Sequence, residues 1–248
     1  MDVRGVGSGG REDYRIGLAG VLRGLSALFW GLPLALLAFA RHFLAILPTL
    51  YDLFFPIAST GLVLFGLFRM APYQRGERIW QRSLLISQSL ALVASGLSPF
   101  LFLWSRMPSV GYFSRAVILL MAVSLLFLVA LLGTLERLAA MLPDDTVRSD
   151  ARLFRGVASY VITVLAGVSV TLYWRMAPVN LSEFLEIPRQ PLGLGRHAIL
   201  LLLILVPVAM AMAVTWKLKE LVLTAVLATA GVMGPEGRSS ASPGNAPS

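Results

Sequence analysis

The sequence predicts an all-α integral membrane protein, built as a six-helix transmembrane bundle with a C-terminal interfacial helix. Of its 248 residues, 57% are apolar and 14% are charged, whereas about 25% are charged in soluble domains. The stretch 198–216 contains no charged residue, and at about 1.5 Å per residue its length matches the roughly 30 Å hydrocarbon core of a bilayer. Arg196 before this stretch and Trp216 and Lys217 at its end are typical of helix ends in the headgroup layers.

The first span is expected around 25–40, which is long enough to cross a bilayer only if 18–22 or 43–47 is added. Residues 1–17 are expected to form a flexible cytoplasmic tail, because the tail is polar and rich in glycine and has little apolar surface to bury. The same region also resembles a signal peptide, with a basic start, an apolar stretch and an ending Ala38-Phe39-Ala40. Cleavage after Ala40, which would remove residues 1–40, is the alternative to an uncleaved first span.

Five more spans are expected at 53–68, 83–104, 116–135, 156–174 and 198–216, so that the transmembrane domain covers 18–217. Prolines follow the second, third and fifth of the six spans, at Pro72, Pro108 and Pro178, and the residue before a proline commonly ends a helix. The link between the fifth and sixth spans contains three prolines, and a short interfacial helix is expected there at 181–187.

The region after Trp216 is apolar but short. Its uncharged part, 221–233, has thirteen residues, which is too few to cross a bilayer unaided. We therefore expect an interfacial helix at 218–233, with a seventh span as the alternative. The last residues, 234–248, are small and polar and are expected to be a disordered tail.

The distribution of basic residues predicts the orientation. With six spans, fifteen of the twenty-one Lys and Arg residues fall on the side of both termini, and the positive-inside rule places that side in the cytoplasm. Nineteen of the twenty-one are Arg, which indicates a GC-rich bacterial genome. We therefore expect a multi-pass protein of the bacterial cytoplasmic (inner) membrane with both termini in the cytoplasm.

A tetrapeptide repeat raises the question of internal duplication. Arg-Met-Ala-Pro occurs at 69–72 and again at 175–178, three spans later. A duplicated three-helix unit would give two halves of inverted topology, as in many transporters. The simpler interpretation is that an interfacial Arg beside an aromatic residue, followed by proline, is a common way to end a membrane helix.

Two stripes of small residues predict helix packing. On the third span Ser87, Ala91 and Ser95 recur every four residues, and on the fifth span Thr163, Gly167 and Thr171 do the same. Small side chains allow close approach of two helices in lipid, and their hydroxyls bond across the gap. We expect both stripes to be packed, and the specific hypothesis is that they pack against each other.

Candidates for chemistry are few. Gln88 is the most polar residue expected within a span; it is the candidate for a transport pathway, or else it bonds to a neighbouring helix. His42 and His197 are expected to be interfacial anchors. Asp144, Asp145 and Asp150 are expected to be solvated charges in a loop. We predict no catalytic residue, no metal site and no cofactor, because no sequence motif for them is present.

These observations favour a non-catalytic subunit, scaffold or accessory protein whose partners are the lipid bilayer and a second membrane protein or another copy of the chain. A transporter or channel for a small solute is the first alternative, and a membrane enzyme acting on a lipid at the acidic loop is the second. The basic residues stand singly or in twos at the ends of apolar runs rather than in one stripe, so nucleic acid is not expected as a partner. There is no cysteine, which excludes disulfide and thiol chemistry.

Overall fold

The computed structural model describes residues 6–44, 54–73, 76–107, 110–141, 145–175 and 191–231, which are helical apart from short turns and contain no strand. The predicted all-α class is therefore confirmed. The interfacial helix expected at 181–187 and the tail at 234–248 lie outside the described residues. The helices are α1 (Val6–Leu44), α2 (Phe54–Met70), α3 (Arg78–Leu97), α4 (Pro99–Arg106), α5 (Gly111–Ala140), α6 (Asp145–Arg175) and α8 (Pro191–Gly231).

Among the described residues, three helical stretches are long and apolar enough to cross a membrane. They are Gly17–Ala40, Arg78–Arg106 and Gly111–Ala140, and they contain the predicted first, third and fourth spans. The shorter helix Phe54–Met70 is also apolar. The chain is therefore a membrane protein by the length and composition of its helices.

The predicted third span is interrupted at Ser98. The backbone N–H of Ser98 donates to the carbonyl of Ser95 at 3.3 Å, which closes a tight turn, and Pro99, which has no N–H to donate, begins α4. The two helices therefore follow one another with only a local break. The helical stretch also begins earlier than predicted, at Arg78.

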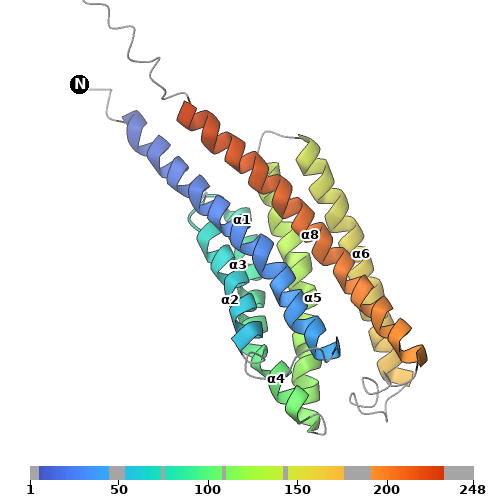
Figure 1. Cartoon of the computed structure of the whole chain (residues 1–248). Coiled ribbons are helices and arrows are strands. Elements are labelled where there is room, and N and C mark those ends of the chain that lie inside the picture. Colours follow the sequence, from blue (N-terminus) through green and yellow to red (C-terminus); the bar gives the residue numbers. More distant parts are fainter. Residues whose placement is uncertain are drawn as a thin grey trace, which may run out of the picture.

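The helices α1 and α8 are longer than predicted, with 39 and 41 residues. Part of the expected flexible tail 1–17 is helical, since α1 begins at Val6, and α8 continues without a break through the boundary expected at 217–218. The residues of α1 just after this tail are buried, as are those of α8 just beyond 217. Leu18 and Val21 of α1 and Leu218 and Val222 of α8 are at most 1% exposed, and the two helices lie side by side (Figure 1).

The helices form a closed ring in which consecutive members run in alternating directions along the bundle (Figure 1). Contacts join α1 to α2, α2 to α3, α3 to α5, α5 to α6, α6 to α8 and α8 back to α1. Helix α5 also contacts α8 across the ring. The start of α1 and the end of α8 lie at the same end of the bundle.

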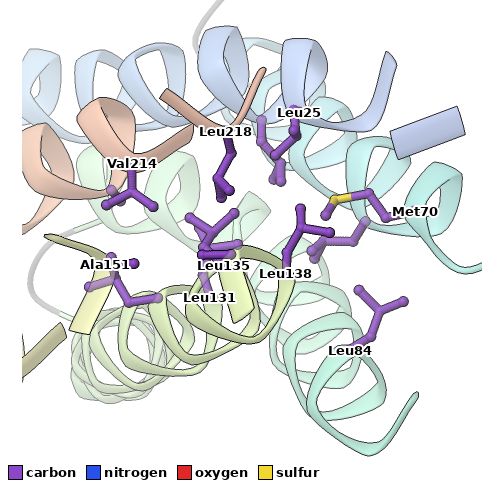
Figure 2. Close-up of a cluster of buried hydrophobic side chains, with 14 of the residues drawn as sticks. Leu25, Met70, Leu84, Leu131, Leu135, Leu138, Ala151, Val214 and Leu218 are labelled. Carbon is purple, nitrogen blue, oxygen red and sulfur yellow. The ribbon is translucent and has the colours of Figure 1, made fainter. Parts of the chain in front are cut away.

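The interior is a leucine-rich core to which α1, α2, α3, α5, α6 and α8 all contribute. Figure 2 shows Leu131, Leu135 and Leu138 of α5 at the centre, surrounded by side chains of the other helices. A second, smaller cluster joins α3, α4 and α5 around Leu101 and Trp104. The core is thus continuous from one side of the ring to the other.

Large apolar side chains also cover the outer faces of the helices. Phe65 of α2, Leu92 of α3 and Leu126 of α5 are each at least 50% exposed. Soluble monomers rarely expose wide apolar surfaces, whereas a lipid environment favours them. The exposed side chains of the bundle are therefore those expected to contact acyl chains.

Candidate functional site

Three hydroxyl groups meet inside the interface between α3 and α5. The hydroxyls of Ser83 and Ser87 each lie 2.9 Å from the hydroxyl of Thr134, which is completely buried. Thr134 can donate its single proton to the carbonyl of Ala130 at 3.0 Å and accept from both serines. The cluster is therefore satisfied internally and joins the two helices.

Gln88, the predicted pathway residue, joins two helices instead. Its side-chain amide donates to the backbone carbonyl of Leu67 on α2 at 3.2 Å. A second contact between the same helices is the hydrogen bond from the hydroxyl of Thr60 to that of Ser95, at 3.3 Å. These polar groups therefore form a row of contacts between α2 and α3.

The backbones of α1 and α2 approach each other closely where glycines face backbone atoms. A Cβ atom added at Gly24 would lie 2.6 Å from the carbonyl oxygen of Gly66, and one added at Gly66 would lie 2.8 Å from the carbonyl oxygen of Gly24. Gly20 faces the carbonyl of Arg69 in the same way, at 2.9 Å. Such distances leave no room for a side chain, so only glycine fits here.

This glycine contact was missed in the sequence. Its signal was the spacing of Gly17, Gly20, Gly24 and Gly31, which places small residues on one face of a helix at intervals of three, four and seven residues. The pattern was overlooked because it begins in a basic N-terminal region that was expected to be flexible.

The two predicted small-residue stripes have different environments. On α3, Ser87 and Ala91 are at most 3% exposed, and Ser95 bonds to α2. On α6, Thr163 and Gly167 are exposed, and no atom lies within 4 Å of a Cβ added at Gly167. The side chain of Thr171 lies outside the described part of the structure.

The predicted pairing of the two stripes is therefore wrong for the described residues. Helix α3 packs against α5, α2 and α4, whereas α6 packs against α5 and α8. The hydroxyls of the α3 stripe bond to Thr134 of α5 and Thr60 of α2. Spacing had identified which face of α3 packs, but a serine hydroxyl is satisfied equally well by any neighbour with an acceptor.

Ion pairs connect α5, α6 and α8 at the end of the bundle where α6 begins. Glu136 of α5 accepts a hydrogen bond from Arg155 of α6 at 2.7 Å, and Arg152 lies 3.7 Å from the same carboxylate. Asp150 of α6 pairs with Lys217 of α8 at 2.5 Å. Sequence analysis grouped Asp150 with Asp144 and Asp145, whose side chains are not among those described. It did not predict either interhelical pair.

Cation–π contacts occur at the ends of α2 and α4 and within α8. Arg69 lies 5.4 Å from the ring of Phe65, Arg106 lies 5.5 Å from Phe102, and Lys219 lies 5.4 Å from Trp216. Each cation follows its aromatic partner by three or four residues, about one helical turn. The first of these ends belongs to the first Arg-Met-Ala-Pro copy; the second copy extends beyond the described part of α6.

Two tryptophans have buried indole nitrogens. The Nε1 atoms of Trp80 and Trp104 have no hydrogen-bond partner among the described residues, and the ring of Trp80 packs edge-on against Tyr73 at 6.2 Å. Within the described residues, no three His, Asp or Glu side chains are grouped so as to hold a metal ion. The side chains of His42 and His197 lie outside this description.

Comparisons with protein-family models, curated proteins and solved structures found no match for this chain. Its function must therefore be argued from the contacts described above.

Proposed function

We propose that the protein is a non-catalytic subunit, scaffold or accessory protein, with six spans, of the bacterial cytoplasmic membrane. The observation that carries this proposal is that polar side chains within the expected spans bond to neighbouring helices. Gln88, Ser87 and Thr134 make hydrogen bonds between neighbouring helices, as expected where polar side chains stabilise helix association in lipid.

Two further features support the six-span arrangement. The bundle is a closed ring of helices that alternate in direction, so each successive helix of the ring returns the chain to the opposite end. The ion pairs of Glu136 and Asp150 lie at one end of this ring, where a charged layer is compatible with a membrane boundary. The count of basic residues supports a cytoplasmic location for this end.

The test is purification of the tagged protein from its native membranes in a mild detergent, with quantification of every co-purifying protein. A scaffold or subunit should retain a membrane protein in stoichiometric amount, or a second copy of itself. The same partner should lose abundance in membranes of a strain lacking this protein, because unassembled subunits are degraded. Recovery of the protein alone, as a monomer active in solute flux in liposomes, would contradict the proposal and favour a transporter.

A further inference from the structure

The two arginines that share Glu136 are oriented by that carboxylate. Arg155 donates to one carboxylate oxygen at 2.7 Å, and the Nε atom of Arg152 lies 3.7 Å from the other. The Glu136 side chain is only 18% exposed, whereas those of Arg152 and Arg155 are 67% and 45% exposed. A largely buried anion therefore holds two largely accessible guanidinium groups.

Most N–H donors of the two arginines are not used in their contacts with Glu136. A guanidinium carries five N–H donors, and Arg155 contributes one of its nitrogens to Glu136. Among the described side chains, two cations around one carboxylate also leave one positive charge without a partner anion. Asp150 does not neutralise it, because its carboxylate pairs with Lys217 on the other side of α6.

The position of the group relative to the membrane limits what can bind there. Glu136 lies near the end of Gly111–Ala140, a stretch able to cross a bilayer, so the guanidinium groups lie near the boundary between hydrocarbon and headgroups. Further into the membrane, Leu126 of α5 and Tyr160 and Val164 of α6 are exposed. Beside Arg155, a Cβ added at Gly156 would meet no described atom within 4 Å apart from its own stretch of helix, which leaves this surface open.

We propose that Arg152 and Arg155 bind the phosphate group of an anionic phospholipid, whose acyl chains lie along the exposed apolar side chains of α5 and α6. Arginine forks bind phosphate oxygens through paired N–H donors, and basic pockets between membrane helices bind anionic lipid headgroups. The uncompensated positive charge selects an anionic lipid over a zwitterionic one. This proposal requires only that α5 and α6 lie in a membrane, and it is independent of the scaffold role.

The experiment measures thermal unfolding of the full chain in a neutral detergent, with phosphatidylglycerol or phosphatidylcholine added at equal mole fractions. Phosphatidylglycerol should raise the unfolding temperature by at least about 3 °C more than phosphatidylcholine, since a ligand of the folded state stabilises it. The Arg152→Gln, Arg155→Gln double variant should lose this difference. Arg82→Gln is the matched control, because Arg82 is an exposed arginine of α3 outside the proposed site, and it should keep the difference.

Three results would overturn the proposal. The first is that both lipids raise the unfolding temperature of the parent protein equally. The second is that Arg82→Gln loses as much of the difference between the lipids as the double variant does. The third is that inorganic phosphate stabilises the parent as much as phosphatidylglycerol does, which would identify a free anion as the ligand. If the double variant does not fold, Arg152→Gln alone serves as the test, because it leaves the 2.7 Å bond between Arg155 and Glu136 in place. That variant should lose at least half of the lipid difference, and full retention would contradict the proposal.

Discussion

At the scale of single residues, the glycines between α1 and α2 make a sharp prediction. Gly24→Ala should destabilise the protein by about 1–3 kcal/mol, the usual cost of overpacking, because the new Cβ would lie 2.6 Å from a carbonyl oxygen of α2. Gly61→Ala, on the open side of α2, should instead be neutral or stabilise by up to about 1 kcal/mol. Reversible unfolding in mixed micelles measures both. Equal effects of the two substitutions would show that α1 and α2 are not in close contact.

The hydroxyl cluster gives a second prediction at this scale. Thr134→Val keeps the shape of the side chain but removes the acceptor of Ser83 and Ser87, and it should cost about 0.6–1.7 kcal/mol per lost contact. Thr134→Ser should restore most of this stability. The matched control is Thr163→Val, since the exposed hydroxyl of Thr163 bonds, among the described residues, to the carbonyl of Ser159 in its own helix. A control as destabilised as Thr134→Val would contradict the role of the cluster.

At the scale of helices, the pairing of α2 with α3 can be tested by crosslinking. The hydroxyl oxygens of Thr60 and Ser95 lie 3.3 Å apart, close enough for cysteines at these positions to form a disulfide. The chain has no cysteine of its own, so the Thr60→Cys, Ser95→Cys variant should lose both free thiols on oxidation, measured by maleimide labelling. The Ser95→Cys, Gly167→Cys variant should keep its thiols. Crosslinking of the second pair and not the first would restore the pairing of α3 with α6.

The C-terminal part of α8 is a second element whose role can be measured. Truncation after Glu220 removes Val222, which is completely buried, and the burial of one valine contributes about 1.5–3 kcal/mol. The truncated protein should therefore be less stable in detergent than one truncated after Gly231, which keeps the whole of α8. Thermal unfolding compares the two. Equal stability would mean that this part of α8 does not contribute to the core.

The sequence predicted the helical class and the location of apolar helices, because an uninterrupted apolar run has few alternatives in lipid. It did not predict the ends of α1 and α8. The length of each span was predicted from the thickness of a bilayer. The ends of α1 and α8 depend instead on contacts between helices, and Val21 and Val222 are buried there. The interhelical partners were also beyond prediction, because the spacing of Ser87 and Ser95 indicates a face of α3 and carries no information on which helix covers it.

At the scale of the whole molecule, the alternation of helix directions predicts the results of reporter fusions. Fusions after Arg78 and Arg148 should report the cytoplasm, because both positions lie near helix starts on the side that carries most basic residues. Fusions after Arg106 and Arg189 should report the outside. A cytoplasmic signal after Arg106 would contradict the crossing by the α3–α4 pair, and one after Arg189 would contradict the number of spans.

The glycine contact between α1 and α2 has a consequence for biosynthesis. The two helices are consecutive in the chain, and contacts between nearby segments form fastest. The pair can therefore associate as a hairpin as soon as α2 has been synthesised, whereas α8, the other long neighbour of α1, is made last. The span Gly17–Ala40 of α1, which contains these glycines, then lies in the bilayer with a partner already in place, and the nascent hairpin provides the surface on which the later helices assemble.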